Sequence, residues 1–357
     1  MNSKHNKHSS ASANDKQKMS KKKLAVNITV LCFSIIFLVA GIVCVNADSL
    51  LGKMNYVADP ESSTPISTSS SASSDDSTSK NAGLLGGLYH DDAIFNVLLM
   101  GVDDYQANDI GRSDSMMLVS VDTRHQKLKI CSFMRDMYVA IPGKSSNRLN
   151  AAYPFGGGGA DGARLTVSTI EANFGIDIDR FVIISNSAFD EIIEQLGGVD
   201  ITLTQAEADL INKNSGDPRK NLSAGTYTLS GKQAHYYSRI RAIGSDFQRT
   251  ERQRTVFTSI VNKFKGSDLG TIYNTLNNVL NLFTTNMTKN EILGMAANSL
   301  TLLNYPIEQL RVPMDGAYQS TYVGKAAVLL PDLDACREAI AEFIYEDDLP
   351  TQSYPSN

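Results

Sequence analysis

The sequence lacks the short motifs that carry several common kinds of catalysis. It has no Gly-x-Ser-x-Gly nucleophile turn, no His-Glu-x-x-His zinc motif and no Cys-x-x-Cys pair. Its five histidines, His5, His8, His90, His125 and His235, form no group with metal-ligand spacing. Any metal site must therefore be built from carboxylates, whose oxygens select a hard cation, Mg²⁺ or Mn²⁺, over zinc.

Basic residues are scarce outside the first 23 residues. The formal charge of the chain is -5, but residues 1–23 hold seven lysines and one aspartate, which leaves 26 basic and 37 acidic side chains in the remainder. A nucleic-acid partner needs a basic surface on the folded part of a protein. The charge balance therefore disfavours nucleic-acid binding.

Cysteine is also rare. Cys32 and Cys44 lie in a long apolar run, which leaves Cys131 and Cys336 in the rest of the chain. These two can pair, or Cys131, which lies in an apolar strand-like segment, can be a small buried hydrophobic residue. The sequence leaves both alternatives open.

One run without charge is long enough to cross a membrane. Residues 24–45 contain 22 uncharged residues, and as a helix they would span roughly 33 Å. A cleaved signal peptide is the alternative, but its apolar core is usually only about 7–15 residues long. The preceding lysines predict a cytoplasmic tail at residues 1–23, a single transmembrane helix at 24–45 and a cell-membrane protein whose C-terminal part is extracellular, with the lipid bilayer as a partner.

The chain after this run divides into a linker, a domain and a tail. Residues 46–91 are rich in Ser and Thr and predict a flexible extracellular linker, because they are too polar to bury a core. Residues 92–345 alternate strand-like and helix-like segments, and residues 346–357 predict a disordered tail.

The alternation predicts an α/β fold: a single ectodomain with a central mixed β-sheet flanked by helices, an α-β-α sandwich. Strands are expected at 94–100, 116–121, 128–133, 181–184, 199–203 and 309–312. Helices are expected at 166–174, 188–196, 205–212, 233–239, 250–264, 268–283, 291–303 and 332–345. Ser230 with Gln233, and Thr288 with Glu291, have the spacing of a helix capping box. The glycine run at 156–159 lacks the second half of a phosphate-loop motif, so a turn is the better interpretation.

Two aspartates stand at the ends of neighbouring strand candidates. Asp103 follows the strand at 94–100, and Asp114 precedes the strand at 116–121. If the strands are adjacent, the two carboxylates face each other and repel unless a cation lies between them. The alternative is that both residues cap turns.

Eight of the fourteen arginines lie in the segments around these strand ends. They are Arg112, Arg135, Arg148, Arg239, Arg241, Arg249, Arg252 and Arg254, and Asp136 and Gln253 lie among them. The planar guanidinium fork suits phosphate oxygens. An ion-pair network with the aspartates is the alternative, but ligands of open α/β sheets bind at strand ends, which favours a phosphate-binding site.

The order of these motifs resembles the LytR-CpsA-Psr family of cell-envelope proteins. The resemblance rests on 96–103 (NVLLMGVD), 111–115 (GRSDS), 135–136 (RD), 148–153 (RLNAAY), 196–199 (LGGV), 229–234 (LSGKQA), 237–241 (YSRIR) and 246–253 (DFQRTERQ). It is strong over about residues 92–265. His235 departs from the family pattern, which more often has an apolar residue there.

The resemblance implies a Mg²⁺-dependent phosphotransferase. Its expected donor is a polyprenyl-pyrophosphate-linked glycopolymer, such as teichoic acid or capsule, and its acceptor is peptidoglycan, at the 6-hydroxyl of N-acetylmuramic acid, joined by a phosphodiester. Asp103 and Asp114 would hold the metal. The pyrophosphate would contact Arg112, Arg135, Arg148, Arg239, Arg241, Arg249, Arg252 and Gln253, and the catalytic residues would be Arg112, Arg135, Arg239, Arg241 and, as general base, Asp136.

Two alternatives stay open. The chain can bind polyprenyl pyrophosphate without transferring anything, as a regulatory envelope protein, or it can be a lipid pyrophosphatase in which water replaces the sugar hydroxyl.

Overall fold

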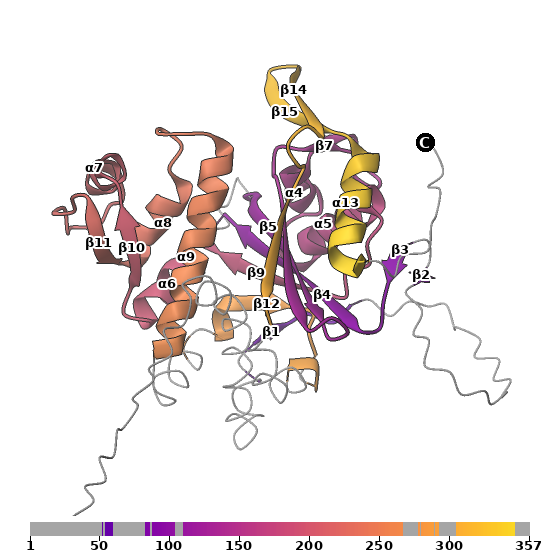
Figure 1. Ribbon diagram of the computed structural model, residues 1–357, viewed down its shortest axis with the longest axis horizontal. Coiled ribbons are helices and arrows are strands. Elements are labelled where there is room, and N and C mark those ends of the chain that lie inside the picture. Colours follow the sequence, from indigo (N-terminus) through magenta and orange to yellow (C-terminus); the bar gives the residue numbers. More distant parts are fainter. Residues whose placement is uncertain are drawn as a thin grey trace, which may run out of the picture.

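The structure is a computed structural model that describes Gly52, residues 54–59, 83–85, 88–103, 110–266, Asn278 and residues 280–288, 290–292 and 305–346 (Figure 1). Within these residues, none of the helices has the length and apolar character needed to cross a membrane. The segments expected to be the cytoplasmic tail and the transmembrane helix, residues 1–23 and 24–45, lie outside the described residues.

A mixed sheet of seven strands forms the centre of the domain, which confirms the expected architecture. In spatial order the strands are β1 (Asn55–Tyr56), β12 (Phe283–Thr285), β9 (Arg180–Ser185), β4 (Ile94–Val102), β5 (Ser113–Asp122), β6 (Lys127–Phe133) and β13 (Ile307–Val312). The pairs β1–β12, β9–β4 and β6–β13 are parallel, and the other pairs are antiparallel.

Both faces of the sheet are covered, because its central strands are apolar on both sides. On one face, Leu98 and Met100 of β4 belong to a core with α5 (Gly159–Phe174) and α13 (Leu333–Tyr345), which lie together in Figure 1. On the other face, Val97 packs in a smaller core that includes Met287. Most of the helices expected at 268–283 and 291–303 lies outside the described residues.

The expectation of a helix through Phe283 is wrong at its end. The described end of that segment is a short 3₁₀ helix, η2 (Leu280–Leu282), and Phe283 already pairs with Ile184 of β9. Pairing with β9 therefore determines the conformation of Phe283, although the local spacing of apolar residues favours a helix.

A helical unit lies beside the central sheet, at the left in Figure 1, and α6 (Asn186–Gln195) joins it to the end of β9. The unit contains α6, α7 (Gln205–Asn214), α8 (Gly231–Arg239) and α9 (Asp246–Gly266), with the hairpin of β10 (Val199–Leu203) and β11 (Gly225–Leu229). Its apolar side chains form a core of their own. The strand expected at 199–203 is thus real but belongs to this unit and not to the central sheet.

Capping boxes begin two of these helices. Ser230 and Gln233 form the expected box at α8, and Thr204 and Glu207 form another at α7. The pair Thr288 and Glu291 also makes the reciprocal hydrogen bonds of a capping box. Side chains thereby satisfy backbone N–H groups that have no partner within the helix.

Short elements complete the domain. They are β2 (Gly83–Leu85) paired with β3 (Leu88–His90), β7 (Tyr138–Val139) paired with β8 (Asn147–Arg148), the 3₁₀ helix η1 (Leu149–Ala151), α4 (Ala152–Phe155), and the hairpin of β14 (Tyr318–Val323) and β15 (Ala326–Pro331). The glycine run at 156–159 forms the turn between α4 and α5, as expected, with three glycines at positive φ.

The fold includes residues from both ends of the expected linker. Asn55 and Tyr56 form the edge strand β1 of the central sheet. Tyr89 is buried in the main core, and its carbonyl oxygen accepts a hydrogen bond of 2.6 Å from the hydroxyl of Tyr345. The folded domain therefore begins before residue 92.

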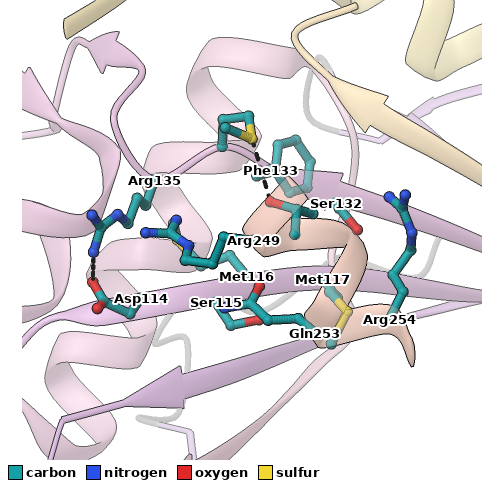
Figure 2. A pocket seen from close by; sticks show the side chains of 12 residues that line it. Asp114, Ser115, Met116, Met117, Ser132, Phe133, Arg135, Arg249, Gln253 and Arg254 are labelled. Atoms are coloured by element: carbon teal, nitrogen blue, oxygen red, sulfur yellow. Dashed lines mark hydrogen bonds and ion pairs between the residues drawn. The ribbon is translucent and has the colours of Figure 1, made fainter. Parts of the chain in front are cut away.

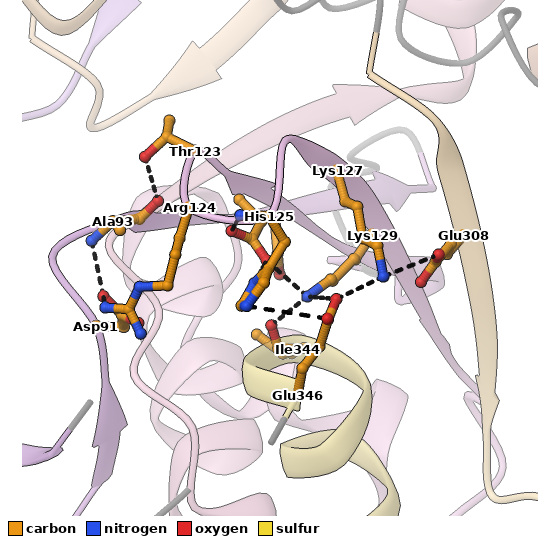
Figure 3. Close-up of polar contacts among 12 residues, drawn as sticks. Asp91, Ala93, Thr123, Arg124, His125, Lys127, Lys129, Glu308, Ile344 and Glu346 are labelled. Atoms are coloured by element: carbon orange, nitrogen blue, oxygen red, sulfur yellow. Dashed lines mark hydrogen bonds and ion pairs between the residues drawn. The ribbon is translucent and has the colours of Figure 1, made fainter. Parts of the chain in front are cut away.

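A buried lysine fastens the end of α13 to the sheet (Figure 3). Nζ of Lys129 is fully enclosed and lies 2.6 Å from Asp122, 2.7 Å from the carbonyl oxygen of Ile344 and 2.8 Å from Glu346. Burial opposes ionisation of Glu346, but hydrogen bonds from Lys127 and Lys129 prevail and lower its pKa to about 2. Glu346, expected as the first residue of the tail, is thus part of the fold, while residues 347–357 lie outside the described residues.

Cys131 and Cys336 are both buried and free. Both belong to the main core. Burial raises the pKa of the Cys336 thiol to about 11. Between the two alternatives for Cys131, the structure supports a small buried hydrophobic residue.

Candidate functional site: two carboxylates among arginines

The register of β4 and β5 brings Asp103 and Asp114 to the same edge of the sheet. Val102 pairs with Ser113, and the backbone N–H of Asp103 donates a hydrogen bond of 3.0 Å to the carbonyl oxygen of Arg112. Gly111 makes this approach possible, because it has a φ of 78° and a Cβ there would lie 2.9 Å from Asp103.

One guanidinium faces both carboxylates. Nη1 of Arg239 lies 3.5 Å from Oδ1 of Asp103, and Nη2 lies 3.9 Å from Oδ2 of Asp114. Arg239 is the last residue of α8, so the helical unit supplies the cation and the sheet supplies the anions. Asn186, at the start of α6, donates a further hydrogen bond of 2.9 Å to Oδ1 of Asp103.

Asp114 is held in its ionised form. Burial alone would raise its pKa, but the charge and hydrogen bond of Arg135, followed by the charges of Arg249 and Arg239, lower it. Nη1 of Arg135 lies 2.6 Å from Oδ1 of Asp114. The carboxylate is therefore available as an anionic ligand.

A pocket opens beside this carboxylate, between β5, β6 and α9 (Figure 2). Its charged and polar lining residues include Asp114, Arg135, Arg249, Gln253 and Arg254, and its apolar ones include Met116, Phe133 and Met134. In Figure 2 the guanidinium groups of Arg135 and Arg249 lie near each other and near Asp114, while Arg254 lies on the other side of the view. Arg249 is only 3% exposed. The pocket thus places positive charge beside Met116 and Phe133, which are almost wholly buried in the main core.

Asp136 lies between two arginines. Nε of Arg135 is 3.5 Å from Oδ2 of Asp136, and Nη1 of Arg148 is 3.4 Å from Oδ1. Arg148 also donates a hydrogen bond of 2.7 Å from Nη2 to the carbonyl oxygen of Ala327 in β15. Arg148 is thus tied to Asp136 and to the β14–β15 hairpin, and it does not line the pocket.

Arg252 does not fit the expected role in phosphate binding. Its side chain is buried, with Nε donating a hydrogen bond of 2.8 Å to Oε1 of Glu207 and Nη1 donating one of 3.1 Å to the carbonyl oxygen of Ile240. A third hydrogen bond, of 3.3 Å, reaches the carbonyl oxygen of Ile243. Arg252 therefore fastens α9 to α7 and to the segment that carries Arg241.

Arg112 and Arg241 are exposed. Arg112 stands between Gly111 and the start of β5, and Arg241 follows α8 by two residues. Their placement in the chain keeps both near the segments that carry Asp114 and Arg239.

Sequence reasoning missed Asn186. It follows β9, which runs parallel to β4, so the rule that ligands bind at the ends of parallel strands would have indicated it.

Residues 56–335 match the LytR_cpsA_psr family. The match covers most of the chain and includes both carboxylates and every arginine of the site. The chain belongs to this family. The expected resemblance is thereby confirmed.

This chain is similar to several proteins that are named as transferases, but only over part of their length. The chain is 36% identical over 179 residues to the polyisoprenyl-teichoic acid–peptidoglycan teichoic acid transferase TagU of Oceanobacillus iheyensis, covering 49% of this chain and 53% of the relative. It is 34% identical over 175 residues to the corresponding transferase TagT of Bacillus subtilis, covering 48% of this chain and 53% of the relative. In each case the chain spans about half the length of the relative.

Solved family structures have the same fold. The crystal structure of B. subtilis TagT is 25% identical with a TM-score of 0.56, covering 71% of this chain and 91% of that one. A structure described as TagT bound to LIIa-WTA gives the same TM-score, identity and coverage.

Proposed function

We propose that this protein is a Mg²⁺-dependent phosphotransferase that moves a cell-wall glycopolymer from a polyprenyl pyrophosphate carrier to peptidoglycan. Membership of the LytR_cpsA_psr family and the transferase names of the relatives support this proposal. The single observation that carries it is the convergence of Arg239, Arg135 and Arg249 around the ionised Asp114, beside a pocket.

The reaction needs one bond to form and one to break. The hydroxyl oxygen of a peptidoglycan sugar attacks the phosphorus that bears the glycopolymer. The bond from this phosphorus to the bridging oxygen breaks, and polyprenyl monophosphate leaves with the electron pair. The hydroxyl proton passes to a base, for which we propose Asp136. Such a transfer depends on positioning and on charge neutralisation, which arginines supply to the phosphoryl oxygens.

The residues present fit a hard divalent cation. Asp103 and Asp114 offer carboxylate oxygens at one sheet edge, the lowered pKa of Asp114 keeps it anionic, and one guanidinium already reaches both side chains. A Mg²⁺ held there would neutralise charge on the pyrophosphate. Arg239, Arg135, Arg249, Gln253, Arg112 and Arg241 are then proposed to surround the phosphates.

We further propose that residues 24–45 anchor the protein in the cell membrane, with the domain outside. The tether would hold the pocket at the leaflet where the carrier head group lies and raise the effective concentration of the donor.

The test is a transfer assay with the purified full-length protein, a lipid-linked glycopolymer, peptidoglycan oligomers and Mg²⁺. We expect covalently attached polymer on the glycan and release of polyprenyl monophosphate. Hydrolysis of the donor without attachment would instead show a pyrophosphatase. Donor that stays bound and unchanged would show a receptor, and either result would overturn the proposal.

A further inference from the structure

Three side chains form a continuous series of contacts that ends at the carboxylate pair. Nδ1 of His235 lies 2.8 Å from Oδ1 of Asp190. Its other ring nitrogen, Nε2, lies 3.3 Å from Nη1 of Arg239, and this Nη1 atom lies 3.5 Å from Oδ1 of Asp103. Asp190 belongs to α6, while His235 and Arg239 are one turn apart on α8. His235 therefore links α6 to the guanidinium that faces both carboxylates.

The chemistry of these groups fixes the form of the imidazole. A guanidinium only donates hydrogen bonds, so Nε2 of His235 must accept and must carry no proton. The ring proton then lies on Nδ1, which is 2.8 Å from Oδ1 of Asp190, an ion-pair distance without the angle of a hydrogen bond. The hydrogen bond from Arg239 thus suits one tautomer of His235, and the carboxylate of Asp190 lies beside the protonated nitrogen of that tautomer.

The ring is held from its surroundings as well. The His235 side chain is 19% exposed, and the ring of Phe189 packs against it edge to face, with centroids 5.9 Å apart and planes at 73°. Asp190 and Phe189 are neighbours on α6, so one helix supplies both restraints. The imidazole is therefore a fixed acceptor, in contrast to a mobile surface side chain.

Arg239 needs such a restraint. Its side chain is 44% exposed, and its contacts to the two carboxylates, at 3.5 and 3.9 Å, are longer than direct hydrogen bonds. Ion pairs at this exposure contribute little, whereas an arginine side chain that is held in one orientation loses much rotamer entropy. Charge attraction alone would leave the guanidinium poorly oriented.

We propose that His235, held by Asp190, is a positioning residue that directs the guanidinium of Arg239 toward Asp103 and Asp114. The proposal rests on the proposed function for the identity of the ligand, a diphosphate, that the oriented guanidinium meets. His235 itself touches no reacting atom. It acts through Arg239 alone, which gives the proposal a sharp test.

The first experiment is a double-mutant cycle in the full-length protein, measured as kcat/KM for transfer. We expect His235→Leu to lower kcat/KM roughly 10-fold to 100-fold, the range caused by misplacing a group in a pre-organised site. His235→Gln should recover most of this loss, because a carboxamide offers both an acceptor and a donor. In an Arg239→Ala background, His235→Leu should have no further effect. Additive losses, or equal losses for the leucine and glutamine variants, would overturn the proposal.

A matched control is Lys232→Ala, an exposed residue on the same helix. Melting curves of all variants should coincide with that of the unsubstituted protein. A His235→Leu variant that loses activity together with its melting transition would show a structural role for His235 in place of a positioning role.

The second experiment does not depend on any substrate. Nitrogen-15 NMR of histidine-labelled full-length protein, with the signal assigned through His235→Gln, should show the Nδ1–H tautomer for His235 and a loss of this preference in Arg239→Ala. Absence of transfer together with this signature would refute the proposed function and leave the positioning role standing. Transfer together with an Nε2–H tautomer would support the proposed function and overturn the positioning role of His235.

Discussion

Nη1 of Arg135 donates a hydrogen bond of 2.6 Å to Oδ1 of Asp114. Arg135 follows β6 and Asp114 lies in β5, so the contact is set by the antiparallel register of two neighbouring strands. It also has the largest effect among the charges that lower the pKa of Asp114. The sheet thereby keeps the carboxylate of Asp114 ionised at its edge.

We expect Asp114→Asn to abolish the response of transfer to added Mg²⁺. Asparagine keeps the shape of the side chain but loses the charge that a hard cation requires. The measurement is the transfer rate across a Mg²⁺ titration, with the melting temperature as a check on folding. A variant that still responds to Mg²⁺ like the unsubstituted protein would contradict a metal role for Asp114.

Arg241→Ala should reduce turnover by roughly 10²-fold to 10³-fold, the range for removing one group that stabilises transition-state charge. Its side chain is exposed, so the melting temperature should stay close to that of the unsubstituted protein. The measurements are initial transfer rates and thermal melting. A collapse of the melting transition would instead assign Arg241 to a structural network.

Arg252→Ala should destabilise the fold by about 3–5 kcal/mol, the cost of breaking a buried ion pair by removing one partner. The reason is that Glu207 would be left as a buried carboxylate beside two unsatisfied carbonyl oxygens. Urea unfolding followed by circular dichroism measures this change. The double variant Arg252→Met with Glu207→Leu should have a free energy of unfolding closer to that of the unsubstituted protein. If the single and the double variant are equally destabilised, an uncompensated charge is not the cause.

Glu171→Gln should stabilise the protein at pH 8 and have little effect at pH 4. Burial raises the pKa of Glu171 to about 7, against a hydrogen bond from the backbone of Ile178 and with help from the charges of Asp177 and Asp179. The folded state therefore binds more protons than the unfolded state between the usual value of 4.5 and about 7, and stability falls as the pH rises through this window. Glutamine keeps the acceptor and lacks the charge. Melting temperatures of both proteins across this range give the test, and a pH-independent difference would refute it.

The sequence predicted the parts of the fold that local pattern determines. Apolar runs marked β4, β5 and β6, and the spacing of apolar residues marked α5 through α9. The β14–β15 hairpin was missed because five of the six residues of β14 are exposed, so it carries no apolar alternation. β12 was missed because its pairing partner lies about 100 residues away in β9.

The sequence indicated which residues are candidates for the site, but it did not indicate which of them contact one another. Asp103, Asp114 and the arginines were found because charged residues stand where apolar strands end. The resemblance implied a phosphate contact for Arg252, and only the fold reveals that its side chain is paired with Glu207 of α7. The partner of a buried charge comes from a distant segment, and one sequence cannot indicate that segment.

The site lies where the strands of the main core meet the helical unit, and Met116 and Phe133 of the main core line its pocket. Asp114 lies in β5, and Asp103 and Arg135 follow β4 and β6. Arg239 and Arg249 lie in α8 and α9 of the helical unit. A shift of the helical unit relative to the sheet would change the separation of these opposite charges. We therefore expect substitutions at the contact between the helical unit and the sheet to alter turnover in the proposed reaction, although they remove none of these charges.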